Sequence, residues 1–318
     1  MSIRALIKVC VLSLALLTPV LHSQSTFQTI ELRMRANDLP LAVVPVYING
    51  SGPFDFVVDT GSTVTMVDED LAAQSRLQPS GQTNIVSVQT GETAMITTIA
   101  DSVVVEGAEA KHLQLGVVKN LRSLPVKVRG VLGEDFLSRF DVLIDYEHGT
   151  LTLTTDGNLL PQRICGEKVS LGTRGEDTAG TVFNRLIVNA RLPSLGRMTA
   201  RLLLDTGTDS MVLFENRLAL PPGAREAVTI SGDALGGARV VDGTILHTMP
   251  VRVGRQGSEV AVKTLIMRSA ATSDVDGMLP LSAFRSIFIS HSRQYAIFNP
   301  ILRTDRQIAY YLARKGKR

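Results

Sequence analysis

The sequence predicts an all-β fold of two pseudo-symmetric β-barrel lobes with few short helices. Runs of Val, Ile, Thr and Leu are broken by Gly, Pro and Asn about every 8 to 12 residues, a spacing typical of strands and turns. The chain has 318 residues, 44% of them hydrophobic, which is enough for two cores. In addition, one segment of the first half recurs in the second half.

The recurring segment is built around an Asp-Thr-Gly tripeptide. Residues 54–67 read FDFVVDTGSTVTMV, and residues 200–214 read ARLLLDTGTDSMVLF. Each has an apolar β-type run, then Asp-Thr-Gly, then a hydroxyl residue and a second apolar run. Asp59 and Asp205 are separated by 146 positions. A tripeptide repeated in matched surroundings indicates an internal duplication.

Later landmarks recur at nearly the same separation. Gly91 and Gly237 each stand 32 residues after their aspartate, between alternating β-formers, which is the pattern of a hairpin. Residues 130–133 (GVLG) correspond to residues 277–280 (GMLP) at a separation of 147. We therefore expect a unit of about 120 to 150 residues, a normal domain size, to have been duplicated in tandem.

These patterns predict a linear organisation of the chain. The expected segments are a leader at residues 1–25, a first lobe at 26–155, a linker at 156–180, a second lobe at 181–303 and a basic tail at 304–318. Short helices are expected at residues 68–76, 134–139 and 280–286, and residues 24–37 are expected to add an outer strand. The linker is placed where Gly, Asp, Glu and Arg replace the apolar alternation.

The first residues have the pattern of a secretory signal. Arg4 and Lys8 precede an apolar run at residues 9–21, and the small polar residues Ser23 and Ser25 follow. The apolar run is short for a membrane span, which needs about 20 residues. The sequence predicts an exported protein, periplasmic or secreted, with a membrane tether through residues 9–21 as the alternative.

Composition argues against several classes of function. The formal net charge of +3 falls to about +1 without the leader, so nucleic acid is not an expected partner. The five histidines lack ligand spacing, so no metal or other cofactor is expected. Cys165 would be the only cysteine after leader removal, which permits no intrachain disulfide, and we expect a free surface thiol. No Gly-x-Ser-x-Gly sequence indicates a serine hydrolase.

Two aspartates brought together could hydrolyse peptides with water. The reaction needs a base to take a proton from water and an acid to protonate the carbonyl oxygen or the leaving nitrogen. Like charges a few ångström apart cannot both ionise readily, so such a pair shares one proton. We therefore expect Asp59 and Asp205 to be catalytic residues.

The neighbouring motif residues have expected supporting tasks. Gly61 and Gly207 would allow a close approach that a Cβ would obstruct. Thr60 and Thr206 would place hydroxyls where the two turns meet and satisfy each other's buried backbone groups. The third supporting pair, Ser62 and Thr208, is expected to donate to the outer carboxylate oxygens.

Two hairpins are expected to act as flaps over a bound peptide. Their expected substrate-binding residues are Thr90, Gly91, Gly236 and Gly237.

Two other aspartates are not expected to be catalytic. Asp209 is expected to point to solvent, and Asp145 is interpreted as a strand or turn residue.

These residues resemble the pepsin and retropepsin group of aspartic peptidases, in which each lobe supplies an Asp-Thr-Gly, a flap and a later hydrophobic-hydrophobic-Gly turn. Residues 131–133 (VLG) match that turn, whereas residues 278–280 (MLP) depart from it at Pro280. The spacing is similar to tandem-fused retropepsin units, as in bacterial retropepsin-like proteins. The resemblance implies retropepsin-like (acid protease) lobes, an active-site cleft between them, and endopeptidase activity on peptide or protein substrates.

Two alternatives remain open. A catalytically inactive protein could bind peptides in the same cleft. A chain could also pair with a second copy, because the resemblance includes unfused retropepsins that act as dimers. Two motifs in one chain make such pairing unnecessary for the site, so we expect a monomer.

Overall fold

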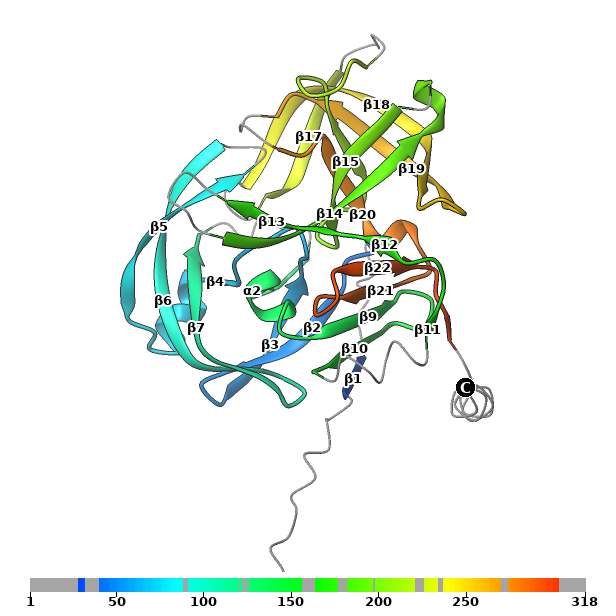
Figure 1. The fold of residues 1–318 in the computed structure, drawn as a ribbon. Helices are drawn as coiled ribbons and strands as arrows, with labels where there is room; N and C mark the ends of the chain where they lie inside the picture. Colours follow the sequence, from blue (N-terminus) through cyan, green and yellow to red (C-terminus); the bar gives the residue numbers. More distant parts are fainter. Residues whose placement is uncertain are drawn as a thin grey trace, which may run out of the picture.

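The structure is a computed structural model, shown in Figure 1. It describes residues 28–31, 40–87, 91–119, 121, 124, 126–155, 164–176, 182–196, 198–220, 226–233, 237–269 and 274–302. The expected leader at residues 1–25 and the expected tail at 304–318 lie outside these ranges. No helix within them has the length and apolar character needed to cross a membrane.

The first lobe is a seven-stranded sheet. Its strands are β2 (Val43–Ile48), β3 (Ser51–Val58), β4 (Met66–Asp68), β5 (Pro79–Ser87), β6 (Gly91–Val105), β7 (Ala108–Val118) and β8 (Gly130–Leu132). They are ordered β2-β3-β8-β4-β7-β6-β5, and β2 also pairs with β6. This second pairing folds the sheet back on itself, so that alternate side chains of these apolar strands face a shared interior.

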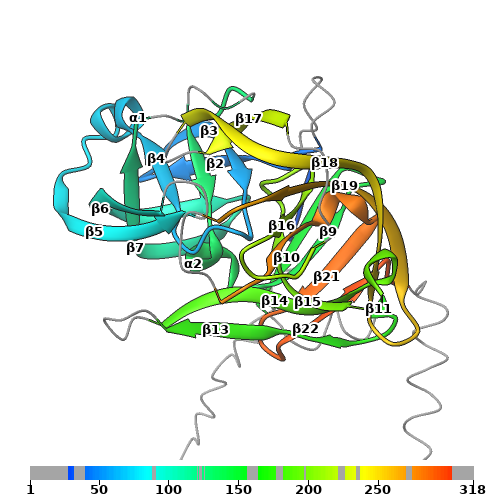
Figure 2. The same ribbon diagram turned by 90° about the horizontal axis from the view of Figure 1, so that it is seen from above.

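The second lobe is an eight-stranded sheet. Its strands are β13 (Gly172–Glu176), β14 (Val182–Leu192), β15 (Met198–Asp205), β16 (Met211–Phe214), β17 (Glu226–Asp233), β18 (Gly237–Val253), β19 (Ser258–Met267) and β20 (Gly277–Pro280). They are ordered β13-β14-β15-β20-β16-β19-β18-β17, and β14 also pairs with β18. Figure 2 shows this sheet beside the first.

The two lobes share one strand topology. In the first lobe β3 runs parallel to β8 and β4 runs parallel to β7, while β4 is antiparallel to β8. In the second lobe β15 and β20 are parallel, β16 and β19 are parallel, and β16 is antiparallel to β20. The prediction of an all-β fold with two pseudo-symmetric lobes and few helices is confirmed. Tandem duplication as its origin stays a prediction.

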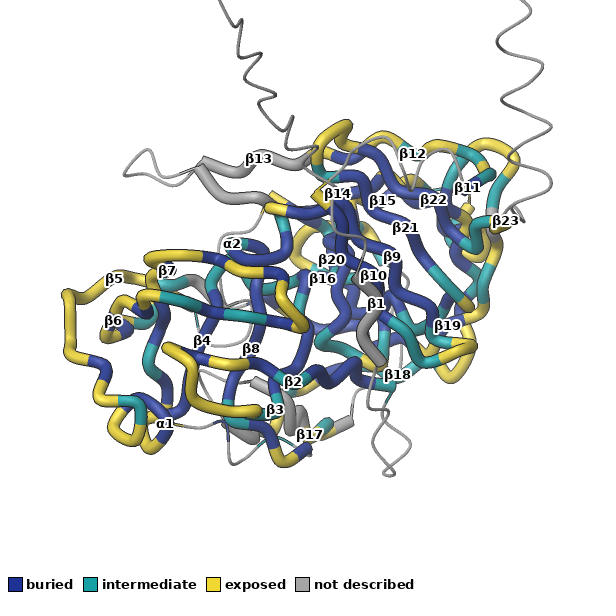
Figure 3. The backbone as a smooth tube through the Cα atoms, turned by 90° about the horizontal axis from the view of Figure 1, so that it is seen from below, coloured by how far each residue is buried: buried dark blue, intermediate teal, exposed yellow. Residues whose placement is uncertain are grey.

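A third sheet joins the two halves of the chain. It contains β1 (Gln28–Glu31), β9 (Asp141–Asp145), β10 (Thr150–Thr154), β12 (Val169–Ser170), β21 (Ser286–Ser290) and β22 (Tyr295–Phe298), ordered β1-β10-β9-β21-β22-β12. At its centre β9 and β21 are antiparallel, with Ile144 opposite Ile287. Figure 3 shows these central strands as buried. The hydrophobic core is continuous between the lobes and this sheet, and includes Phe56, Ile144, Leu204 and Ile289.

The segment expected to be a linker contains short strands. Besides β12 and β13 it includes β11 (Ile164–Cys165), which pairs with β23 (Ile301–Leu302). β12 extends the third sheet, and β13 extends the second lobe. Backbone pairing at a sheet edge does not require a run of apolar side chains, which is why composition did not reveal these strands. The expected outer strand at residues 24–37 corresponds to β1, which pairs with β10.

The helices are short. The expected helices at residues 68–76 and 134–139 correspond to α1 (Glu69–Gln74) and α2 (Glu134–Leu137). Residues 280–286 contain only a single 3₁₀ turn, η3 (Leu281–Ala283), and a second 3₁₀ turn, η2 (Pro193–Leu195), was not predicted. Asp68 caps α1, because its side chain accepts a hydrogen bond from the Leu71 N–H at 2.6 Å.

Gly277→Ala should destabilise the second lobe. A Cβ at this position would lie 2.1 Å from the carbonyl oxygen of Val212, in the neighbouring strand β16, so the backbone would have to move. We expect a loss of about 1 to 3 kcal/mol in the free energy of unfolding, measured by urea denaturation. Gly81→Ala is the matched control, because the nearest atom to its Cβ is the Thr97 hydroxyl at 3.5 Å. Equal stability of the two variants would contradict this packing.

Candidate active site

Each Asp-Thr-Gly turn stands at the end of a central, buried strand. Asp59 directly follows β3, and Asp205 is the last residue of β15. The preceding residues, Val58 and Leu204, are fully buried. The N–H of Asp59 donates to the carbonyl oxygen of Leu132 in β8, so the first turn continues the parallel pairing of its strand. Rigid strands therefore determine where both turns lie.

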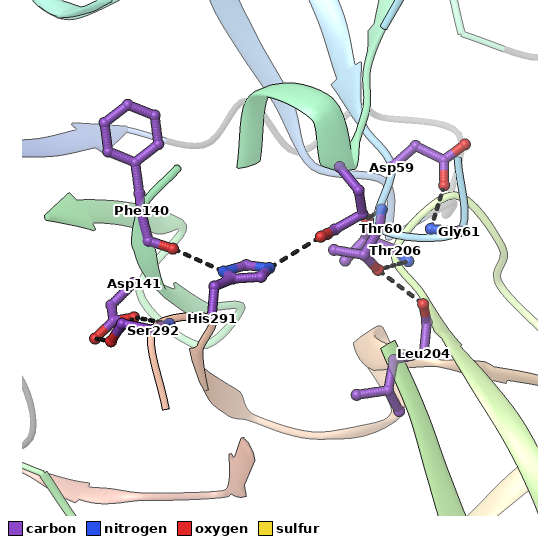
Figure 4. Close-up of polar contacts among 10 residues, drawn as sticks. Asp59, Thr60, Gly61, Phe140, Asp141, Leu204, Thr206, His291 and Ser292 are labelled. Atoms are coloured by element: carbon purple, nitrogen blue, oxygen red, sulfur yellow. Dashed lines mark hydrogen bonds and ion pairs between the residues drawn. The ribbon is translucent and has the colours of Figure 1, made fainter. Parts of the chain in front are cut away.

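The two turns are joined by four reciprocal hydrogen bonds through their threonines. The Thr206 hydroxyl accepts from the Thr60 N–H at 3.0 Å and donates to the carbonyl oxygen of Val58 at 2.6 Å. In the opposite direction, the Thr60 hydroxyl accepts from the Thr206 N–H at 3.2 Å and donates to the carbonyl oxygen of Leu204 at 2.9 Å. Figure 4 shows part of this contact. Both threonines are buried, so each turn satisfies backbone groups of the other.

The two carboxyl groups lie against opposite turns. A Cβ on Gly61 would lie 2.7 Å from the Asp205 carboxyl carbon, and a Cβ on Gly207 would lie 2.8 Å from that of Asp59. Neither glycine has a positive φ. Glycine is therefore required here by space and not by backbone conformation. Both carboxyl groups consequently meet at the junction of the turns.

Backbone N–H groups hold the carboxyl groups in place. Asp59 Oδ1 accepts from Gly61 at 2.9 Å and from Ser62 at 3.1 Å. Asp205 Oδ1 accepts from Gly207 at 2.7 Å. These bonds orient each carboxyl group within its own turn.

The pKa values of both aspartates are raised. Burial is the main cause of the raised pKa of Asp59, opposed by the N–H groups of Gly61 and Ser62. Burial raises the pKa of Asp205 well above its usual range, and the neighbouring charge of Asp59 raises it further. The backbone N–H groups of Gly207 and Thr208 act in the opposite direction. The pair therefore retains a proton at pH values where an exposed aspartate has lost it, and the apparent pKa values belong to the pair.

The hydroxyls of Ser62 and Thr208 do not have the expected contacts. Ser62 Oγ donates to the carbonyl oxygen of Val64 at 2.8 Å, and Thr208 Oγ1 donates to that of Ser210 at 3.0 Å. A hydroxyl has only one proton to donate, so neither can also donate to a carboxylate. The prediction for these two hydroxyls was wrong in this respect. Backbone N–H groups bind the carboxylates instead, because the turn already directs them inward.

The departure from the motif at Pro280 is compensated within its lobe. In the first lobe the Gly133 N–H donates to the Thr65 hydroxyl at 3.1 Å, and Thr65 in turn donates to Asp135 through its hydroxyl and its N–H. In the second lobe the equivalent positions are Pro280 and the buried Met211. Proline has no N–H, so it needs no acceptor at the position that corresponds to Thr65.

A buried ion pair that the sequence did not reveal lies beside the Asp59 turn. Glu134, the first residue of α2, contacts His291 at 2.9 Å between Oε2 and Nε2. The His291 Nδ1 lies 2.7 Å from the carbonyl oxygen of Phe140. Figure 4 shows the His291 ring between Phe140 and the Asp59 turn. The two residues stand 157 positions apart, so no local spacing could have indicated the pair.

The other expected residues are placed as follows. Asp209 is exposed, as expected, and accepts a hydrogen bond from the Ser210 hydroxyl at 2.9 Å. Asp145 ends β9 and accepts from the backbone N–H of His148. Cys165 is half-buried and free. Among the described residues, no cluster of three or more His, Cys, Asp or Glu could hold a metal ion.

The expected flap residues are only partly described. Gly91 begins β6 with φ +76°, a conformation that favours glycine, and pairs with Ser87. Gly237 begins β18 and pairs with Asp233. The remaining two expected residues, Thr90 and Gly236, lie outside the described ranges. The two hairpins therefore exist, and their action as flaps stays a prediction.

Comparison with known proteins gives a family match that includes the first of the two turns. Residues 44–136, from β2 to α2, match the family model described as aspartyl protease. This match includes Asp59 and confirms the resemblance to aspartic peptidases over that segment. It supports an aspartic protease function.

One solved structure that the chain resembles is a retropepsin-like aspartic protease from Rickettsia conorii. The sequence identity is 18% and the TM-score 0.30, and the alignment covers 41% of this chain and 93% of that one. No curated protein matches the sequence.

Thr206→Val should weaken the junction of the turns. The variant removes the acceptor for the Thr60 N–H and the donor to the Val58 carbonyl, which leaves two buried polar groups without partners. We expect a loss of about 2 to 5 kcal/mol in the free energy of unfolding, measured by urea denaturation.

Thr208→Val is the matched control for this variant. Its hydroxyl donates within its own turn, to Ser210, and the residue is only half-buried. We expect a loss of about 1 kcal/mol or less. An equal loss of unfolding free energy in both variants would show that the contact between the turns contributes no more to stability than the Thr208 hydroxyl does.

Proposed function

We propose that the protein is an aspartic endopeptidase in which Asp59 and Asp205 activate water between them. The observation that carries the proposal is the reciprocal position of the two carboxyl groups, each against the glycine of the other turn. One carboxyl group takes a proton from water while the other protonates the carbonyl oxygen or the leaving nitrogen of the peptide. Bond cleavage then needs no covalent intermediate.

The surroundings suit this chemistry. Burial raises the pKa of each aspartate, so one proton stays on the pair at mildly acidic pH. The threonine contacts hold the turns rigidly, so the carboxyl groups need little reorganisation when the reaction begins. The β5–β6 and β17–β18 hairpins are proposed to close over an extended peptide or protein segment.

The cellular setting belongs to the same proposal. Residues 1–25 have the pattern of a secretory signal, so we place the enzyme outside the cytoplasm, in the periplasm or secreted. One chain carries both Asp-Thr-Gly turns, so a monomer can form the whole site. Size-exclusion chromatography with light scattering measures the oligomeric state directly.

Asp59→Asn and Asp205→Asn should each abolish cleavage of a diverse peptide mixture by the purified mature protein, followed by mass spectrometry of the products. An amide can neither take the proton from water nor share the proton of the pair.

Both Asn variants should still fold. Both pKa values are raised, so ionisation of the pair costs stability at neutral pH, and each Asn variant should melt at the wild-type temperature or above it at pH 7. Cleavage retained by the double variant would contradict the proposal, whereas peptide binding without cleavage by the wild type would favour a noncatalytic binding protein.

The pH dependence of kcat/KM should show a shared proton. The pKa of Asp205 is raised well above its usual range, so activity should persist above pH 4 and decline as the pH rises through that raised pKa. At the acid end, protonation of both carboxyl groups removes the base and lowers the rate. Initial rates on one cleaved peptide between pH 2 and 9 measure both limbs. A rate that increases steadily to pH 9 would be incompatible with a carboxyl pair that shares a proton.

A further inference from the structure

A buried ion pair connects the second half of the chain to the α2 helix of the first lobe. Glu134 has 1% exposure, and the His291 side chain has 6%. The Phe140 carbonyl can only accept, so the His291 Nδ1 must carry a proton, and a protonated ring donates at Nε2 to Glu134 as well. Burial lowers the pKa of His291, but the hydrogen bond and charge of Glu134, the Phe140 carbonyl and the charge of Asp141 together outweigh it, and the pKa is raised. Burial also raises the pKa of Glu134, opposed by the hydrogen bond and charge of His291, so one proton is shared between Glu134 Oε2 and His291 Nε2. We assign this proton to the ring, where both nitrogens then donate and the contact is an ion pair.

The same glutamate contacts the Asp59 turn through its main chain. The Glu134 N–H donates to the carbonyl oxygen of Ser62 at 2.9 Å. The Ser62 N–H in turn donates to Asp59 Oδ1 at 3.1 Å. Three polar contacts, joined through the covalent bonds of Glu134 and Ser62, thus connect His291 to the carboxyl group of Asp59.

The Asp205 side has no such pair at the equivalent positions. The register of β8 and β20 makes Leu281 the equivalent of Glu134. The corresponding registers of the β9–β10 and β21–β22 hairpins make Tyr146 the equivalent of His291. Within the part of the chain that the structure describes, the buried Tyr146 hydroxyl has no hydrogen-bond partner, and burial and the charge of Asp205 raise its pKa. The lobes thus differ in charge where each borders the candidate dyad.

We propose that Glu134 and His291 are positioning residues for the reaction: their ion pair sets the place of the Asp59 turn relative to Asp205, acting through Ser62. This inference rests on the proposed endopeptidase function. Other charged groups also face the pair. Asp59 and Asp135 face Glu134, and Asp141 faces His291. Loss of His291 leaves Glu134 Oε2 buried without its partner beside two other acidic groups, so the Glu134 carboxyl group must take up a proton or move away from the turn.

His291→Gln tests the inference with steady-state kinetics on one cleaved peptide. The variant removes the cation but keeps a side chain that can reach the same partners. We expect kcat to fall roughly 10- to 100-fold, because a small displacement of the Asp59 turn misaligns the reacting groups. KM should change little, since the pair lies behind the Asp59 turn and not among the expected flap residues.

Two further variants separate positioning from general packing. Glu134→Gln combined with His291→Gln replaces the ion pair by a neutral hydrogen-bonded pair and should recover most of the rate that His291→Gln loses, because no buried charge is left alone. Ser292→Ala is the matched control. It removes hydroxyl bonds from the second half of the chain to Asp141 at 3.0 and 3.2 Å without touching Glu134, and it should leave kcat unchanged.

The outcomes are distinct. A wild-type kcat in His291→Gln, or an equal loss of kcat in Ser292→Ala, overturns the inference. If His291→Gln does not fold, as judged by circular dichroism, His291→Tyr replaces it, since Tyr146 occupies the equivalent position in the first half. A third outcome would also overturn the inference. If His291→Gln and His291→Tyr both fail to fold, and the double Gln variant cleaves at the wild-type rate, the pair contributes to stability alone. Asp59→Asn is assayed alongside, because cleavage by that variant would refute the proposed function itself, whatever His291→Gln does.

Discussion

The hydrogen bonds between Thr60 and Thr206 are the contact on which the site depends. Each threonine satisfies a backbone N–H and a backbone carbonyl of the opposite half, all of them buried. Neither turn could bury these groups alone without leaving them unpaired, which would cost free energy at every group. The lobes must therefore meet at this point, and the third sheet, through β9 and β21, joins them a second time. The position of both carboxyl groups follows from this junction.

The lobes share a topology but stabilise their turns with different chemistry. The first lobe uses a polar network in which Asp135, Thr65 and the Gly133 N–H satisfy one another, and adds the buried Glu134 contact to His291. The second lobe uses apolar residues at the equivalent positions, including Met211 and Pro280. A polar network in one lobe and apolar packing in the other thus support the same turn geometry. A pseudo-symmetric fold thus surrounds its two aspartates with different electrostatic environments, which favours separate pKa values within the pair.

The sequence was most informative where a local pattern implies geometry. The repeated Asp-Thr-Gly and its apolar strands predicted two similar lobes, and a small residue between two close carboxyl groups could be anticipated at Gly61 and Gly207. It was less informative where contacts depend on residues far apart in the chain. The hydroxyl of Ser62 has several acceptors within reach of one turn, and only the folded backbone decides among them. Glu134 and His291 carry no motif, although aligning the two halves shows that their counterparts, Leu281 and Tyr146, differ in charge. That difference was a signal that could have identified the pair.

The central claim is that Asp59 and Asp205 share one proton, and carboxyl carbon chemical shifts test it directly. Protein labelled with ¹³C at aspartate carboxyl groups is titrated by NMR, with the signals of these two residues assigned from the Asn variants. The account predicts two well-separated midpoints that belong to the pair, the higher one above the ordinary aspartate value of about 3.9. Replacing one aspartate by Asn should leave a single midpoint for the other. Two independent titrations near pH 4, unchanged by substitution of the partner, would contradict it.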